Sequence, residues 1–279
     1  MTAHPRLSLN QATIKGAPLA EALEVTATAG ISSIGIWREP VAEVGLERAV
    51  ELVAASGLRV SSLCRAGFFT MPEGPSRRAA IDDNVRAIEE TAALGAPTLV
   101  LVAGGLPEGS RDLAGARERV RDAIGELADV AGSAGISLAI EALHPMYVSD
   151  RAVISTLGQA LDIALQFDAA RVGVVVDTFH VFWDPAVLAT IARARGYIAM
   201  YQVCDWATPL PADVLLSRYQ PGDGVIDFAP ITAAVLAAGY QGDIEVEIFN
   251  QAIWDAPAAE TAARTIEAFG SFIAPLLGL

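Results

Sequence analysis

Several residue types are scarce in this sequence, and their scarcity excludes particular kinds of functional site. Lys15 is its only lysine, which excludes a Schiff-base lysine on a late strand and a phosphate-loop lysine after a glycine-rich turn. Cys64 and Cys204 are its only cysteines and lie far apart, outside any C-x-x-C motif. We therefore interpret them as reduced thiols and expect a cytoplasmic protein.

Long apolar runs and positive charge are also scarce. The start, MTAHPRLSLN, has no apolar stretch typical of a signal peptide, and no run reaches the roughly 20 apolar residues of a membrane-spanning helix. Basic residues number 19 against 33 acidic ones, and the resulting formal charge of -14 should repel a phosphate backbone. We expect neither a membrane nor a nucleic acid as a partner.

The pattern that is present is an alternation of short β-type runs with alanine-rich helical stretches. We expect strands at 7–10, 32–37, 58–63, 97–102, 136–141, 171–177, 197–203 and 243–248. We expect helices at 19–29, 44–56, 76–94, 110–134, 152–166, 185–195, 229–238 and 257–275. This alternation predicts an α/β fold of the (β/α)8 or TIM barrel type. A doubly wound sheet would carry G-x-G-x-x-G after its first strand, where this chain reads NQATIKG.

The composition favours a single large core. Apolar residues make up 53% of the 279 positions, and no linker, charge run or low-complexity segment interrupts them. The mean hydropathy of +0.41 is high, and a barrel with two buried layers accounts for it without a membrane. We predict one domain over residues 1–279.

Four side chains with oxygen donors stand at the ends of consecutive apolar runs. They are Glu141 in SLAIE, Asp177 in VGVVVD, Gln202 in YIAMYQ and Glu247 in DIEVE. The carboxyl ends of barrel strands share one face, so these oxygens should converge. One divalent cation would neutralise three buried carboxylates, and donors that are all oxygen favour Mn²⁺ or Mg²⁺ over Zn²⁺.

Each of these four residues also has an ordinary structural role open to it. A carboxylate in a loop can cap or begin a helix, a glutamine can satisfy backbone groups in a core, and a glutamate can pair with an arginine. The metal hypothesis depends on the coincidence of four successive strand ends. Glu245 shares a face with Glu247 and, where it lies deeper, needs a partner of its own, for which we expect Arg65 or another arginine.

Five further residues near the strand ends are candidates for contacting a substrate. His180 in DTFH can serve as an acid or base, and His144 in EALHPMY is similarly placed. Arg218 lies in the long loop 204–228 and can hold a phosphate, a carboxylate or a sugar hydroxyl. Trp37 and Trp206 offer flat faces to a sugar ring. A loop histidine, a surface arginine or an aromatic anchor is the structural alternative for each.

Several segments resemble the sugar phosphate isomerase/epimerase family, whose members are similar to xylose isomerase in their TIM barrel. These segments are LAIEALHPMY, VGVVVDTFH, PGDGVIDF and GYQGDIEVEIF. The resemblance implies that the Glu-Asp-His-Glu metal ligands of ketose 3-epimerases correspond to Glu141, Asp177, Gln202 and Glu247. Gln202 departs from the family, where many relatives have histidine, and this further disfavours zinc. The resemblance also implies that His180 and Arg218 contact the substrate.

From these residues we expect a divalent-metal-dependent isomerase or epimerase that acts on a ketose, a sugar phosphate or a related polyol ketone. The cation would stabilise an enediolate, while Glu141 and Glu247, on opposite sides of the reacting carbon, would remove and return the proton.

Two alternatives stay open. A lyase would expel a β-hydroxyl from the same enolate, as an inosose or 3-dehydroshikimate dehydratase does, or would cleave an oxidised C-glycoside. A barrel that lacks catalysis would bind a sugar or serve as a partner subunit. The alanine-rich outer helices leave room for a homo-oligomer.

Overall fold

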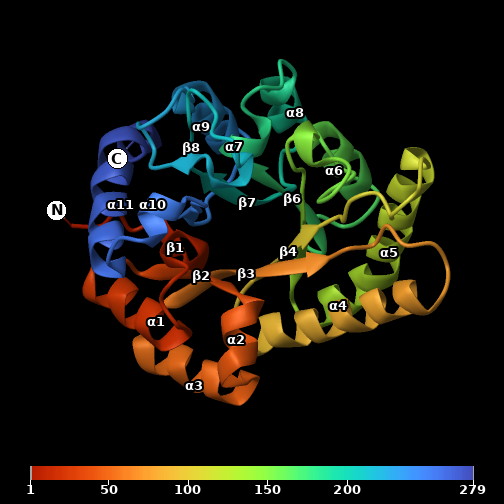
Figure 1. The fold of residues 1–279 in the computed structure, drawn as a ribbon, viewed down its shortest axis with the longest axis horizontal. Coiled ribbons are helices and arrows are strands. Elements are labelled where there is room, and N and C mark those ends of the chain that lie inside the picture. Colours follow the sequence, from red (N-terminus) through yellow and green to blue (C-terminus); the bar gives the residue numbers. More distant parts are fainter. Residues whose placement is uncertain (1, 279) are drawn as a thin grey trace.

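Eight parallel strands close into a barrel in the order β1-β10-β7-β6-β5-β4-β3-β2 (Figure 1). The structure is a computed structural model that describes residues 2–278. The barrel strands are β1 (Leu7–Asn10), β2 (Ser33–Trp37), β3 (Arg59–Gly67), β4 (Thr98–Val102), β5 (Ser137–Glu141), β6 (Val172–Asp177), β7 (Ile198–Val203) and β10 (Ile244–Val246). The predicted TIM barrel is therefore confirmed. The single domain over 1–279 stays a prediction, and its residues 1 and 279 lie outside the described part.

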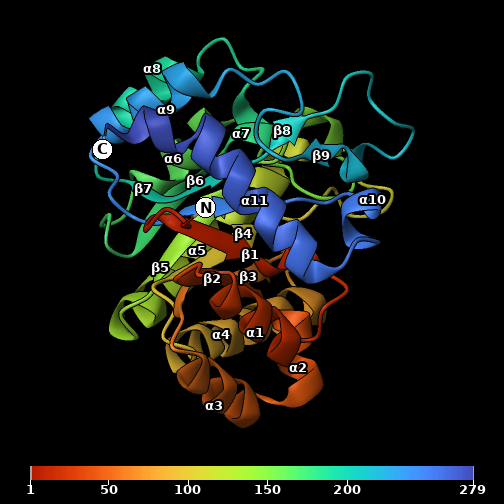
Figure 2. The same ribbon diagram turned by 90° about the vertical axis from the view of Figure 1, so that its left-hand side faces the viewer.

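Helices surround the barrel on its outer side (Figures 1 and 2). They are α1 (Leu19–Thr28), α2 (Arg38–Val44), α3 (Leu46–Ser56), α4 (Pro75–Ala93), α5 (Leu113–Ser133), α6 (Leu157–Ala164), α7 (Thr178–Val181), α8 (Val187–Arg193), α9 (Phe228–Ala237), α10 (Gln251–Trp254) and α11 (Ala258–Phe272). Short 3-10 turns cover Gln11–Ile14, Pro145–Tyr147, Val214–Leu216 and Ala274–Leu277. No helix within residues 2–278 is long and apolar enough to cross a membrane.

Local sequence signals explain most helix boundaries. The side chain of Asp112 caps α5 by accepting from the Gly115 amide, and Thr156 caps α6 in the same way. Gly45, with a φ of 83°, separates α2 from α3, so the expected helix 44–56 begins only at Leu46. Residues 38–43, to which we assigned neither a helix nor a strand, belong to α2.

The loop 204–228 contains a small antiparallel pair. β8 (Asp205–Trp206) pairs with β9 (Arg218–Tyr219), and Trp206 stands opposite Arg218. Asp205 anchors the end of this loop, since its carboxylate accepts from the amides of Gly222 and Ile226 at 2.9 Å each. The pairing returns the chain over the barrel mouth and positions Arg218 there.

The inside of the barrel has an apolar and a polar part. Strands β3 to β7 contribute one small apolar cluster, Cys64, Val100, Ala139, Val175 and Met200. On β6, β7, β10 and β1, polar residues stand side by side in register: Asp177 beside Gln202, Gln202 beside Glu245, and Glu245 beside Ser8. Because side chains alternate along a strand, Glu247 faces the same way as Glu245 but nearer the strand end.

Gly35 on β2 makes room for this polar layer. A Cβ atom at this position would lie 2.6 Å from Cδ of Glu245, which is fully buried. The carboxylate has no free space to retreat into, because four hydrogen bonds hold it. The glycine is thus required by the close approach of a side chain from across the barrel.

We expect Gly35→Ala to lower the free energy of unfolding by about 1–3 kcal/mol, because it overpacks a fixed buried carboxylate. Gly158→Ala is the matched control, since a Cβ there has its nearest neighbour at 3.8 Å, in helix α6. Urea unfolding followed by circular dichroism measures both variants. Equal stability of the two variants would contradict this account of Gly35.

Candidate active site

A cavity of about 500 Å³ opens at the carboxyl-terminal end of the barrel strands. Glu141 at the end of β5, Glu247 just after β10, and His180 in α7 line its inner part together with Arg218. Trp37, Arg65 and Phe68 line the wall formed by β2 and β3. Of the four expected ligands, Glu141 and Glu247 line this cavity, and the shared metal site of all four stays a prediction.

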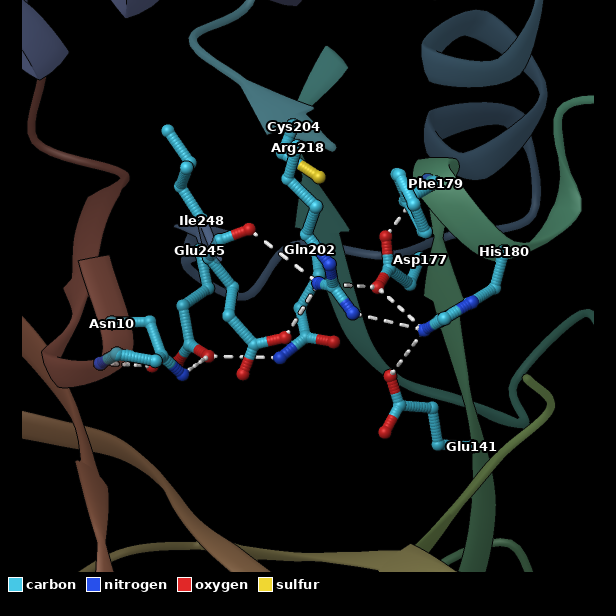
Figure 3. A network of polar contacts seen from close by, with 12 residues as sticks. Asn10, Glu141, Asp177, Phe179, His180, Gln202, Cys204, Arg218, Glu245 and Ile248 are labelled. Atoms are coloured by element: carbon cyan, nitrogen blue, oxygen red, sulfur yellow. Dashed lines mark hydrogen bonds and ion pairs between the residues drawn. The ribbon is translucent and has the colours of Figure 1, made fainter. Parts of the chain in front are cut away.

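Arg218 occupies the centre of this group (Figure 3). Its side chain is only 4% exposed, although it comes from a loop. Its Nη1 donates to Asp177 Oδ2 at 3.2 Å and to Glu247 Oε2 at 2.8 Å. The guanidinium also lies over the rings of Phe179 and Phe249, at 4.8 and 4.9 Å. Arg218 is thus the cation that balances the buried carboxylates in this structure.

The three carboxyl groups at the mouth hold their protons more tightly than free carboxylates do. Burial, followed by the charges of Glu247 and Asp177, raises the pKa of Glu141 well above its ordinary value. Burial likewise raises the pKa of Asp177, and it raises that of Glu247 to about 7 although Arg218 opposes the shift. One guanidinium therefore does not fully compensate three buried carboxylates, and the mouth has room for further positive charge.

The two ring nitrogens of His180 each face an N–H group. Its Nδ1 accepts from the backbone N–H of His144 at 3.1 Å. Burial lowers the pKa of His180 well below its usual range, so the ring is neutral and carries a single proton. Its Nε2 lies 3.7 Å from Glu141 Oε1 and 3.7 Å from Asp177 Oδ2, and 3.0 Å from Nη2 of Arg218, which can only donate.

The position of the His180 proton depends on Arg218. Potential ligand atoms of Glu141, Asp177 and His180 lie within 4.8 Å of one another, a spacing that could hold a metal ion. The contact with His144 favours a proton on Nε2, whereas the contact with Arg218 Nη2 favours a lone pair there. A ligand that draws Arg218 away would leave Nε2–H free to donate a hydrogen bond into the cavity.

Gln202 is oriented by Glu245. Its Nε2 donates to Glu245 Oε1 at 3.0 Å, so its Oε1 points away from that carboxylate (Figure 3). This oxygen is buried and has no hydrogen-bond partner within residues 2–278. A buried acceptor without a partner costs stability, typically about 1–3 kcal/mol, unless a ligand satisfies it. Gln202 stands beside Asp177 in register, and its unpartnered oxygen is a donor type that a hard divalent cation accepts.

Glu245 itself does not pair with an arginine, so that expectation was wrong. The fully buried carboxylate accepts from four neutral donors: Asn10 Nδ2 at 2.6 Å, Ser61 Oγ at 2.6 Å, Ser62 Oγ at 3.0 Å and Gln202 Nε2 at 3.0 Å. Several direct hydrogen bonds replace the counterion, because they stabilise the charged form of a carboxylate.

The remaining predicted site residues fall into two groups. Trp37 lines the cavity and donates through Nε1 to Asn10 Oδ1 at 2.8 Å. His144 and Trp206 instead pack against each other, with ring centroids 5.2 Å apart and a tilt of 41°, and are absent from the described cavity lining. Their assignment to substrate binding stays a prediction; His144 contacts His180 through its backbone N–H.

Tyr147 is a cavity residue that the sequence did not single out. Its ring stands edge-on to His180, with 6.0 Å between the ring centroids, and lines the cavity. Its hydroxyl is buried and finds no partner in the described chain. Only its place in the motif EALHPMY, directly after the fifth strand, could have indicated it.

Comparisons with known proteins agree with this geometry. A family model described as xylose isomerase-like TIM barrel matches residues 23–270. A 3-dehydroshikimate dehydratase of Pseudomonas putida is 32% identical over 163 residues, which make up 54% of this chain and 24% of that protein. An inosose isomerase of Bacillus licheniformis is 29% identical over 140 residues, 49% of this chain and 48% of that protein. The chain spans about half the length, or less, of these curated relatives.

Solved structures show the same barrel. Protein SMc04130 from Sinorhizobium meliloti 1021 superposes with a TM-score of 0.93 and 46% identity, over 96% of this chain and 98% of that chain. The IOLI protein with a bound zinc atom gives a TM-score of 0.85 at 21% identity, over 98% of this chain and 100% of that chain, a likeness that shows the fold alone. Because the family model covers most of the chain and the barrel is closed as the family requires, the resemblance is confirmed: the chain belongs to the xylose isomerase-like TIM barrel family.

Proposed function

We propose that this protein is a divalent-metal-dependent isomerase or epimerase that moves a proton next to the carbonyl of a ketose or related polyol ketone. The observation that carries the proposal is the pair Glu141 and Glu247, two buried carboxylates on the inner cavity wall, with the unpartnered Gln202 Oε1 beside them. The inosose isomerase among the relatives supports this reaction class.

Glu141, Asp177, Gln202 and Glu247 would hold the cation. Three carboxylates and an amide oxygen favour Mn²⁺ or Mg²⁺ over Zn²⁺, which prefers nitrogen and sulfur ligands. When bound, the cation would supply the positive charge that stabilises negative charge developing on the substrate oxygen.

The protein's own groups would move the proton. Glu141 comes from β5 and Glu247 follows β10, so the two carboxylates approach a bound carbon from different sides of the barrel mouth. Two such groups suit epimerisation, in which the proton leaves one face and returns to the other, whereas one suffices for isomerisation. His180 would donate its Nε2–H to a substrate oxygen and keep that oxygen in place.

We expect Glu247→Gln to lower turnover by at least about 100-fold, since it removes a general base and leaves the shape of the side chain nearly unchanged. The measurement is exchange of substrate C–H with deuterated water, followed by NMR for D-fructose and an inosose at saturating Mn²⁺. Glu43→Gln, a carboxylate on the cavity rim, is the control and should exchange normally. Full exchange by the Glu247 variant would refute the assignment.

We also expect Glu245→Gln to weaken Mn²⁺ binding by about 10–100-fold, because Gln202 would lose the acceptor that fixes its amide. Free Mn²⁺ measured by electron paramagnetic resonance during a titration gives the affinity without reference to turnover. Glu51→Gln on the exposed side of α3 serves as the control. Unchanged Mn²⁺ affinity in the Glu245 variant would show that Gln202 is not oriented in this way, or is not a ligand.

A second candidate is a lyase that expels water from the same intermediate. Tyr147 favours it, because this residue lines the cavity, its buried hydroxyl has no partner within residues 2–278, and burial raises its pKa. A protonated hydroxyl can donate to a leaving group, whereas the depressed pKa of His180 makes that residue a poor acid. The dehydratase among the relatives agrees with this reading. Product mass separates the two candidates, by loss of water against no change.

We expect Tyr147→Phe to leave the protein at least as stable and to impair catalysis. Removing a hydroxyl that has no partner relieves a desolvation cost of about 1 kcal/mol, while substrate loses its contact with that hydroxyl. Tyr201→Phe is the matched control, since Tyr201 Oη forms a buried hydrogen bond with Thr232 Oγ1 at 2.8 Å and its loss should destabilise. Thermal unfolding and turnover of both variants test this. A destabilised Tyr147 variant with normal turnover would contradict a role at the site.

A further inference from the structure

We propose that Arg65 forms a binding site for an anionic group of the substrate, a carboxylate or a phosphate, on the wall of the cavity. This inference rests on the proposed function and extends it to a substrate class: a polyol ketone that carries a negative charge at some distance from its carbonyl. Only some of the cations near the mouth still have hydrogen-bond donors that no carboxylate uses.

Two other arginines near the mouth are less free. Arg38 donates to Glu90 through Nε at 2.6 Å and to Asp83 through Nη1 at 2.8 Å, and its Nη2 contacts both carboxylates. Arg218 is buried, with Nη1 on Asp177 and Glu247, Nη2 beside His180 Nε2, and a buried Nε that has no partner within residues 2–278. To turn toward a further anion, either guanidinium would have to give up a carboxylate.

Arg65 differs from both. No residue within 2–278 accepts a hydrogen bond from its guanidinium, and its nearest carboxylate, Glu39, lies 3.8 Å away and is exposed. The Arg65 side chain is 33% exposed, and it lines the same cavity as Glu141 and Glu247. A planar guanidinium with unused donors facing a cavity is well suited to hold a carboxylate or phosphate with two parallel hydrogen bonds.

Two aromatic rings fix the orientation of this guanidinium. Arg65 Cζ lies 5.5 Å from the ring centroid of Trp37 and 5.3 Å from that of Phe68. Stacking leaves the edge of the guanidinium, where its N–H groups point, free to meet an anion. An arginine that is already ordered in this way loses less side-chain entropy on binding an anion than a freely moving one does.

The backbone beside Arg65 is built to support that stack. Phe68 is the only described non-glycine residue with a positive φ, 63°, a conformation that costs about 1 kcal/mol or more. Gly67 before it has a φ of 113°, and a Cβ there would collide with the backbone of Val102. Phe68 remains 45% exposed despite its apolar ring. An exposed, strained aromatic on a cavity wall is understandable when its ring supports Arg65.

Two other cations with exposure to solvent line the cavity. Arg151 lies over the ring of Tyr147 and beside Asp150, with Nε 3.6 Å from its Oδ2, and Lys15 lies over the ring of Trp254. Arg65 differs from both because its guanidinium contacts two aromatic rings, and we therefore assign the anionic substituent to Arg65.

Three ketoses that differ only at carbon 6 test the proposal: D-fructose, D-fructose 6-phosphate and D-fructuronate, which carries a carboxylate. Calorimetric titration of the Mn²⁺-loaded protein measures the affinity of each. We expect the wild type to prefer the phosphate, the carboxylate or both, and Arg65→Gln to lose about tenfold or more in affinity for the preferred anion but none for D-fructose. Arg65→Lys should recover part of the loss, because it keeps the charge but not the planar donors.

Arg151→Gln is the matched control and should retain the preference for the anion. Three results would overturn the proposal: a wild type without preference among the ketoses or without binding of any, an equal loss for D-fructose in Arg65→Gln, and transfer of the effect to Arg151→Gln. Binding and deuterium exchange are separate readouts. A protein that prefers the anion through Arg65 but exchanges no C–H would refute the proposed reaction and leave the anion site intact.

Discussion

The balance of charge at the barrel mouth is the constraint on which the rest of this structure depends. Glu141, Asp177 and Glu247 are buried where water cannot stabilise their charge, and the guanidinium of Arg218 contacts two of them. The loop that carries Arg218 must therefore return over the mouth, which the β8–β9 pair ensures. Any cation that takes Asp177 Oδ2 and Glu247 Oε2 must move Nη1 away from those oxygens. In the proposed metal site, occupancy by a cation and the position of Arg218 would be linked for this reason.

Glu245, beneath the mouth, determines the orientation of Gln202. An amide can be placed with its oxygen and nitrogen either way round, so its oxygen has a fixed direction only if its nitrogen is held elsewhere. Glu245 holds that nitrogen, and its own charge is stabilised by neutral donors from β1 and β3 together with Gln202. Gly35 leaves the space that this arrangement needs. The direction of the Gln202 oxygen thus depends on residues from several strands.

The sequence predicted the features that repeat and missed those that depend on distant partners. All eight barrel strands coincide with predicted strands to within a few residues. Short apolar runs and the glycines that end helices are local signals, so they can be recognised in the sequence. Placement of Glu141 and Glu247 followed from barrel geometry in the same way. The hydrogen-bond partners of Glu245 could not be predicted from the sequence, because Asn10 and Ser61 lie far from it along the chain. These donors are neutral, so no pattern of opposite charges in the sequence indicates them. Tyr147 was missed because a buried hydroxyl without a partner is visible only in three dimensions.

Tyr147 and Arg65 both line the cavity, and each keeps unused hydrogen-bonding capacity. The ring of Tyr147 stands edge-on to His180, while Arg65 lies on the wall that β2 and β3 form. A buried hydroxyl without a partner is costly in the free protein, whereas water can hydrate the partly exposed guanidinium of Arg65. Under the proposed function, a substrate that completes both groups would carry an oxygen near Tyr147 and a negative charge near Arg65. Such a pair of contacts would select among polyol ketones by shape and charge.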